Sequence, residues 1–181
     1  MKQFEEIIAT ESIYKGRILD LDLHDVSLPD GNIAKREVVS HHGAVALLPV
    51  FQGCIYFVRQ YRIAAGKILT EIPAGLLEVG EDPYDAAIRE CREEIGLRPL
   101  ELFKLGEFMP TPGYCTEKIS LFVGTDFVQD PLEEDPDEFL KIVRIPIRTA
   151  RTLFLNGQFS DGKTSAALGY YFTTESIGRK G

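Results

Sequence analysis

The most constraining feature of this chain is the stretch at residues 75–97, GLLEVGEDPYDAAIRECREEIGL, which combines helix-boundary signals with a row of glutamates. Asp82 occupies an N-cap position, Pro83 follows at the first helical position and Gly96 ends the pattern, so a helix is predicted between them. Apolar residues recur at helical spacing and predict one face turned toward a core: Tyr84, Ala87, Ile88, Cys91 and Ile95.

A row of acidic side chains lies beside that apolar face. Glu90 and Glu94 are one helical turn apart and Glu93 is next to them, whereas Arg89 and Arg92 project away. Carboxylates at this spacing repel each other, and partial burial strengthens the repulsion, so we expect a cation there. Carboxylate oxygens are hard ligands, which favours Mg²⁺ or Mn²⁺ over zinc. The alternative is a solvated Glu/Arg face, as in most charged helix stripes.

Composition argues against several classes of protein. The 181 residues carry a net charge of −8, with a pI near 5.0, so no basic stripe is available for nucleic acid. No signal peptide is recognised, and no apolar run approaches the ~18 residues that a membrane span needs. The three cysteines, Cys54, Cys91 and Cys115, are unclustered and predict reduced thiols. We therefore expect a cytoplasmic protein without disulfides.

The first forty residues differ from the rest. Residues 17–28 alternate apolar and polar side chains, residues 29–32 (PDGN) form a turn signal, and residues 33–40 extend again, which predicts an antiparallel β-hairpin. A two-stranded ribbon is marginally stable alone, so it must pack on the main body or on another subunit. We expect residues 1–42 to be such a ribbon and to mediate a homodimer.

The remainder of the chain has the pattern of a mixed α and β domain. Residues 44–50 and 54–61 predict a buried strand pair. Further strands and two late helices complete a mixed sheet between helices; the strands are at residues 68–72, 100–108, 118–123 and 139–145, and the helices at 147–155 and 163–172.

The spacing of the glutamate stretch resembles the Nudix box at every defined position, from Gly75 through Glu81, Arg89-Glu90 and Glu93-Glu94 to Leu97. The one soft departure is Cys91, where the family usually has Ile, Leu or Val, and a cysteine packs as a small hydrophobe. The order of elements also agrees with that family. The resemblance implies an α+β fold, an α/β/α sandwich around a mixed β-sheet, with residues 43–181 as the Nudix hydrolase domain and the N-terminal β-ribbon in front of it.

Other segments resemble the ADP-ribose pyrophosphatase subfamily. They are FVRQYR at residues 57–62, EIPAG at 71–75, Thr111-Pro112-Gly113 and Glu117-Lys118. By this resemblance, Glu90, Glu94 and the main-chain carbonyl of Ala74 are expected metal ligands, with Glu93 auxiliary. Arg89 is expected to form an ion pair with Glu81 or Glu93 and so to hold the glycine turn and the predicted helix together. Glu81 is therefore expected to have either a structural or a catalytic role.

The resemblance also implies a general base from an acidic loop late in the chain, here residues 132–138. Glu138 best matches a loop glutamate that reaches the metal. Because Pro136 stands where relatives often have a glutamate, the base is alternatively Glu134, Asp135 or Asp137. For any single residue, an ordinary solvated acidic loop is the competing interpretation.

Arginine side chains and residues of the N-terminal ribbon are expected to contact the substrate. Arg62 is the phosphate candidate, because arginine suits bidentate phosphate contact, whereas Arg59 is equally well explained as a solvated strand residue. The subfamily resemblance adds further substrate-binding candidates, each of which is alternatively an ordinary exposed residue: Glu71, Lys35, Glu37, Glu117 and Pro112. Lys35 and Glu37 would contact the purine across a dimer interface, and Glu117 the terminal ribose.

The function that these features favour is Mg²⁺-dependent hydrolysis of the diphosphate of ADP-ribose to AMP and ribose 5-phosphate. One alternative substrate is another nucleoside diphosphate sugar, such as a GDP- or UDP-sugar. Two non-enzymatic alternatives are a Nudix module that binds ADP-ribose without cleaving it and an acidic interaction domain.

Overall fold

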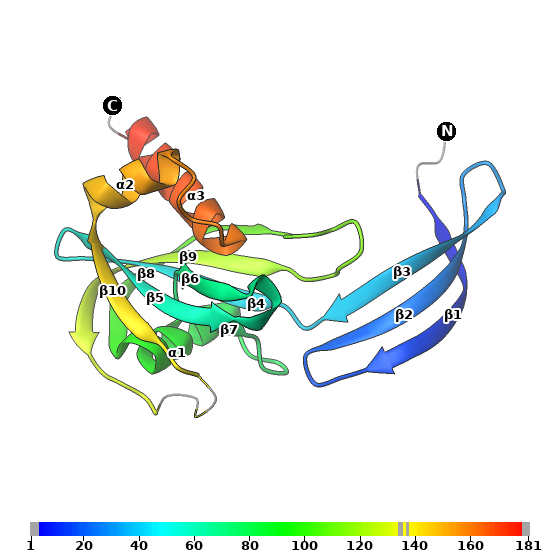
Figure 1. Ribbon diagram of the computed structural model, residues 1–181, viewed down its shortest axis with the longest axis horizontal. Helices are drawn as coiled ribbons and strands as arrows, with labels where there is room; N and C mark the ends of the chain where they lie inside the picture. Colours follow the sequence, from blue (N-terminus) through cyan, green and yellow to red (C-terminus); the bar gives the residue numbers. More distant parts are fainter. Residues whose placement is uncertain (1–3, 134–135, 137, 179–181) are drawn as a thin grey trace. The chain divides into compact units, whose positions relative to one another are not determined.

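The computed structural model describes residues 4–133, 136 and 138–178, which belong to two compact units (Figure 1). The first unit comprises Met1–Gly43 and Met109–Lys118, and the second comprises Ala44–Phe108 and Ile119–Gly181. Residues 109–118, which the sequence assigns to the second domain, thus belong to the first unit.

The first unit is an antiparallel sheet in the order β1-β2-β3, with β1 at Glu6–Lys15, β2 at Leu19–Ser27 and β3 at Ile33–His41. The turn between β2 and β3 uses Gly31, whose φ of 87° lies in the left-handed region that favours glycine. Segment 109–118 joins the unit through Val39, whose N–H donates to the Tyr114 carbonyl at 2.7 Å and whose carbonyl accepts from Thr116 at 2.9 Å.

The predicted N-terminal ribbon is confirmed, but it has one strand more than the expected pair. Residues 6–15 were not predicted as a strand. They contain β-branched and aromatic residues that favour extended backbone, such as Ile7, Thr10 and Tyr14. Every residue of β1 is exposed, so only its pairing with β2 reveals the strand.

The second unit is a mixed sheet in the order β10-β5-β4-β9-β8, to which β6 adds beside β5 and β7 beside β4. Its strands are β4 Ala44–Phe51, β5 Cys54–Arg62, β6 Lys67–Glu71, β7 Ala74–Leu76, β8 Leu97–Phe108, β9 Ile119–Gln129 and β10 Lys141–Pro146. Strands β4 and β9 run parallel, and the other pairs are antiparallel.

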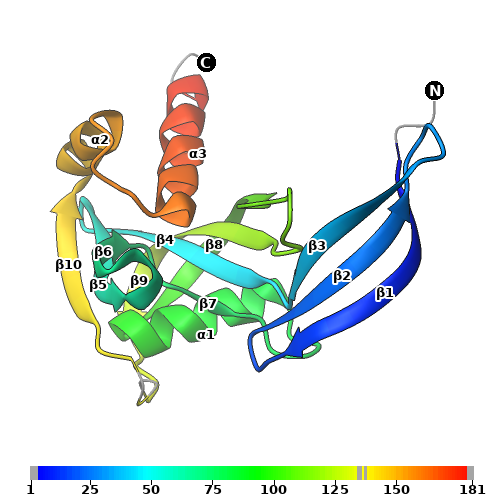
Figure 2. The same ribbon diagram turned by 45° about the vertical axis from the view of Figure 1, so that its right-hand side comes forward.

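Helix α1 (Pro83–Ile95) covers one face of this sheet, while α2 (Ile147–Leu155) and α3 (Gly162–Gly178) lie on the other (Figure 1, Figure 2). Strand β4 is buried on both faces: Leu48 belongs to the core cluster beneath α2 and α3, and Leu47 to the cluster beneath α1. The predicted α/β/α sandwich is therefore confirmed, and its core explains the continuous apolar run at residues 44–50.

None of the helices in the described part of the chain is both long and apolar enough to cross a membrane. Cys54, Cys91 and Cys115 are free thiols, as predicted.

Candidate active site

The glutamate row lies on α1, whose ends are set by its own sequence. The Asp82 carboxylate accepts a hydrogen bond from the Tyr84 N–H at 2.8 Å, and Gly96 ends the helix with a φ of 70°. The buried residues of the apolar face are Ala86, Ala87, Cys91 and Ile95. Tyr84 departs from the prediction: it is 43% exposed, and its ring meets that of Phe122 edge-on.

Glu94 is a buried carboxylate, 5% exposed, beside the turn that follows β6. Its Oε2 accepts a hydrogen bond from the Ala74 N–H at 3.3 Å. Burial raises the pKa of Glu94 well above its ordinary value, and the negative charges of Glu138 and Glu90 raise it further. A positive charge at this position would therefore stabilise the ionised form.

Glu90 shares this environment and touches the same turn. Burial raises the pKa of Glu90 to about 7, although Arg89 Nη1 lies 2.6 Å from its Oε1 and opposes that shift. A Cβ atom at position 75 would stand 2.0 Å from Glu90 Oε1, so Gly75 leaves the space that this carboxylate occupies. The row and the turn are therefore packed directly against each other.

Arg89 joins the helix to the segment before it. Its Nε and Nη2 donate to the two carboxylate oxygens of Glu81 at 2.9 Å each, and Nη2 also donates to the Leu76 carbonyl at 3.1 Å. Its Nη1 donates to Glu93 at 3.0 Å as well as to Glu90. The hydrogen bonds from Arg89 lower the pKa of Glu81. Arg89 thus has the joining role expected from the sequence, but the expectation that it projects away from the row is wrong, because its long side chain reaches back to pair with Glu90.

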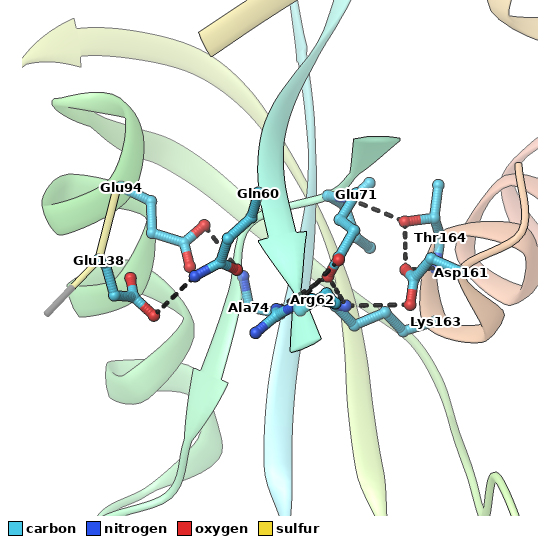
Figure 3. A network of polar contacts seen from close by, with 10 residues as sticks. Gln60, Arg62, Glu71, Ala74, Glu94, Glu138, Asp161, Lys163 and Thr164 are labelled. Atoms are coloured by element: carbon cyan, nitrogen blue, oxygen red, sulfur yellow. Dashed lines mark hydrogen bonds and ion pairs between the residues drawn. The ribbon is translucent and has the colours of Figure 1, made fainter. Parts of the chain in front are cut away.

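Glu138 lies close to the row. Gln60 Nε2 donates to its Oε1 at 3.5 Å, and its charge contributes to the raised pKa values of both Glu90 and Glu94 (Figure 3). The alternative base candidates Glu134, Asp135 and Asp137 lie outside the described residues.

A second polar network surrounds Glu71, which is 1% exposed (Figure 3). Arg62 donates to both of its oxygens at 2.9 Å, and Lys163 Nζ donates to Oε2. Burial works to raise the pKa of Glu71, but these two cations outweigh it, so the pKa of Glu71 lies below its ordinary value. Arg59, the other cation proposed on β5, is exposed and stands opposite Thr70.

The start of α3 also contributes to this network, which the sequence pattern did not predict. Asp161 accepts from Lys163 at 3.1 Å and from the Thr164 N–H at 2.9 Å, and Thr164 Oγ1 accepts from the Ile72 N–H at 2.9 Å. An aspartate just before a helix is a local N-cap signal. No local signal pairs Lys163 with Glu71, because they are 92 residues apart.

The remaining predicted substrate contacts belong to the first unit: Lys35, Glu37, Pro112 and Glu117. Lys35 and Glu37 are two positions apart on β3, so they lie on the same side of the sheet, and both are exposed. Lys35 Nζ donates to Asp25 at 2.9 Å. Glu117 Oε1 lies 4.0 Å from His41 Nε2. The structure thus gives Lys35 and Glu117 partners within their own unit.

The donor set of the row fits a hard divalent cation. Glu90, which is partly buried, and Glu94, which is buried, are two carboxylates with raised pKa values, and Gly75 brings main chain within contact of Glu90. Across the described residues, no three His, Cys, Asp or Glu side chains are already gathered around one ion position. Glu90 instead accepts a hydrogen bond from Arg89, and Glu94 accepts one from the Ala74 amide. A bound cation would add to these two partners or replace them.

Comparison with known families agrees with the fold and the site. Residues 40–168 match the NUDIX domain, and residues 5–39 match the nucleoside diphosphate sugar hydrolase N-terminal domain. The chain therefore belongs to the Nudix family. Both the predicted family and the predicted class, an enzyme that hydrolyses nucleoside diphosphate compounds, are supported by these matches.

Several relatives extend over nearly the whole chain. An ADP-ribose pyrophosphatase of Bacillus subtilis (strain 168) is 38% identical over 98% of each chain, and a methanol dehydrogenase activator of Bacillus methanolicus is 38% identical over 99% of each. The ADP compounds hydrolase NudE of Escherichia coli (strain K12) is 26% identical over 90% of this chain and 88% of its own. A crystal structure of an ADP compounds hydrolase has the same fold, with a TM-score of 0.86 at 24% identity, covering 99% of this chain and 97% of the other.

Proposed function

We propose that this enzyme hydrolyses the diphosphate of ADP-ribose in a divalent-cation-dependent reaction that yields AMP and ribose 5-phosphate. The observation that carries the proposal is a pair of carboxylates, the partly buried Glu90 and the buried Glu94, packed against the turn at Ala74 and Gly75. Similarity to the Bacillus subtilis ADP-ribose pyrophosphatase along the full chain supports the choice of substrate.

The metal-holding residues in this proposal are Glu90, Glu94, the carbonyl of Ala74 and Glu138, with Mg²⁺ as the cation and Mn²⁺ as its substitute. When bound, such a cation neutralises diphosphate oxygens and lowers the pKa of a bound water. Glu81 and Glu93 act through Arg89, whose hydrogen bonds orient the Glu90 carboxylate.

Glu138 is the proposed general base. It takes a proton from the attacking water as the water oxygen bonds to phosphorus and the bridging P–O bond breaks, which leaves a monophosphate on each product. The hydrogen bond from Gln60 holds the Glu138 carboxylate near the row. If Glu138 is not the base, Glu134, Asp135 and Asp137 in the same acidic loop are the remaining candidates.

The proposed substrate contacts follow the resemblance to ADP-ribose pyrophosphatases. Arg62, which donates to Glu71 through Nε and Nη2 in this structure, would bind the diphosphate, because a planar guanidinium suits bidentate phosphate contact. Arg59 is a second candidate on the same strand. The base and terminal ribose would be contacted by residues of the first unit: Lys35, Glu37, Pro112 and Glu117.

We also propose a homodimer formed through the first unit. Strand β1 is an edge strand whose apolar side chains are exposed, among them Ile7, Ile8 and Ile13. An exposed apolar edge is a surface that a second chain commonly covers. Light scattering at working concentration should give a dimeric mass, and a monomeric mass would contradict this part of the proposal.

A cytoplasmic location completes the proposal. The three free thiols at Cys54, Cys91 and Cys115 agree with a reducing compartment, where disulfides are rare. Cell fractionation that found the protein outside the cytoplasm would contradict it.

The test is a panel of nucleoside diphosphate derivatives assayed with Mg²⁺, with Mn²⁺ and with a chelator, followed by product identification. We expect fastest turnover of ADP-ribose, release of AMP and ribose 5-phosphate, and loss of activity with chelator. Faster turnover of a GDP- or UDP-sugar would favour the alternative substrate class. ADP-ribose binding without turnover in any metal would favour the non-catalytic module.

A further inference from the structure

We propose that Lys163 is a positioning residue for substrate binding, because it remains the counter-ion of Glu71 when Arg62 turns from Glu71 to the diphosphate. This inference rests on the proposed function, since it takes Arg62 as the phosphate-binding cation. It assigns a role to the first turn of α3, which lies outside the Nudix box.

The observation behind the inference is a buried carboxylate with two cations. Arg62 Nε and Nη2 donate to the two oxygens of Glu71 at 2.9 Å each, and Lys163 donates to one of the same oxygens (Figure 3). A single cation would be sufficient to neutralise one carboxylate. The second cation is therefore available for another partner.

The two cations differ in what they can reach. The side chain of Arg62 is 41% exposed, whereas that of Lys163 is 13% exposed and is also held by Asp161 at 3.1 Å. Within the described residues, Arg62 Nη1 makes no hydrogen bond. The negative charges of Glu94 and Glu138 also act on Arg62, which places its guanidinium near the glutamate row. Arg62 is thus the cation that can turn to a ligand.

Burial of Glu71 makes the second cation necessary. Removing the only partner of a buried charge is strongly unfavourable, because the remaining charge has neither water nor a counter-ion. With Lys163 in place, Glu71 keeps one ion pair after Arg62 leaves. Without Lys163, Arg62 would be the sole counter-ion of Glu71 and would be retained there, so substrate would bind less tightly.

A stability cycle tests this claim without any substrate. Thermal unfolding midpoints are compared for wild type, R62A, K163M and the double variant R62A/K163M. We expect each single variant to lose little, because Glu71 keeps one cation. The double variant should lose more than the sum of the two, and adding E71Q to it should recover most of that loss.

Additive losses in this cycle would overturn the proposal. If R62A/K163M does not fold, the triple variant with E71Q decides the question: a folded triple variant supports the proposal, and an unfolded one contradicts it.

Kinetics with ADP-ribose and Mg²⁺ test the consequence for binding. We expect K163M to raise KM roughly 10-fold with a smaller change in kcat, and K163R to keep KM near wild type. Adding E71Q to K163M should lower KM again, because Arg62 is no longer held by a carboxylate. A purely structural role of Lys163 predicts instead that K163M/E71Q is at least as impaired as K163M. The matched control is K104M, an exposed lysine on β8, which should leave both constants unchanged.

The two proposals fail in different ways. If wild type does not turn over ADP-ribose, the proposed function is wrong, and the stability cycle alone decides whether Lys163 is the retained counter-ion. If wild type is active and KM does not change in K163M, only this inference is wrong.

Discussion

Two groups of carboxylates with little exposure to water, Glu90 with Glu94 and Glu71 by itself, have opposite electrostatic states in the second unit. The pKa values of Glu90 and Glu94 are raised, to about 7 in the case of Glu90, whereas the pKa of Glu71 lies below its ordinary value. All three are glutamates with little exposure, and burial works to raise the pKa of each one. Burial alone therefore does not explain the difference.

The difference lies in how many cations each group has. Glu71 has both Arg62 and Lys163, of which Lys163 is shared with Asp161. Among the described residues, Glu90 is paired with Arg89 alone, which also bonds to Glu81 and Glu93, and the Glu94 carboxylate accepts a hydrogen bond from the neutral Ala74 amide. The chain balances the charge at Glu71 but leaves the row short of positive charge, which is why we propose the row as the site of a cation from solution.

The largest expected effect comes from neutralising the row. E94Q or E90Q should lower kcat with ADP-ribose by at least about 1,000-fold, because a metal ligand is lost. The metal-free unfolding free energy should not fall, since the substitution removes a repelling charge. Mg²⁺ should raise the thermal midpoint of wild type but not that of E94Q. The control E101Q changes an exposed glutamate on β8 and should alter neither quantity. A large stability loss in metal-free E94Q would contradict the contrast between Glu71 and the pair Glu90 and Glu94.

Neutralising Glu71 should have the opposite signature. E71Q should lower the unfolding free energy at pH 7 by roughly 3 kcal/mol, because two cations lose their buried partner. The folded-state pKa of Glu71 is depressed, so its contribution is present above the unfolded value, ordinarily 4.5, and is lost as pH falls through the folded value. Urea unfolding at several pH values should show wild type and E71Q converging at low pH. A constant difference down to the acid limit would count against a charged Glu71.

The close contact between Glu90 and Gly75 predicts a smaller effect. G75A would place a methyl group at 2.0 Å from Glu90 Oε1 and displace that carboxylate, so we expect activity to fall roughly 10-fold. Stability should change little, because the end of a flexible side chain can move. G169A is the matched control, since its added methyl meets only Phe154, at an ordinary contact distance of 3.6 Å. Equal activity in the two variants would show that the Glu90 position is not critical.

The smallest effect is expected where the same charge pattern is exposed. Asp130 also has two cations, Arg92 at 3.2 Å and Arg98 at 2.9 Å, but all three side chains are partly open to water. R98M should therefore lower the unfolding free energy by less than about 1 kcal/mol. If R98M lowered the unfolding free energy as much as E71Q does, the number of paired cations, and not the burial of the carboxylate, would determine how strongly the substitution destabilises the protein.

The α1 part of the site was predictable because its signals are local. Asp82 and Gly96 set the helix ends, and the spacing of Glu90 and Glu94 puts them on one row whatever the rest of the chain does. The sandwich followed from the apolar runs and their order. Strand β1 was not predicted, because its residues are exposed and only its pairing with β2 defines it.

What the sequence determined by itself is the helix, its glutamate row and the family to which the chain belongs, since each depends on residues a few positions apart. Only the tertiary structure decided that Lys163 shares Glu71 with Arg62 and that Glu90 lies against Gly75. The physical reason is that a carboxylate's charge state depends on the cations and water around it in space. Those neighbours come from β5, β6 and α3, and folding alone brings them together.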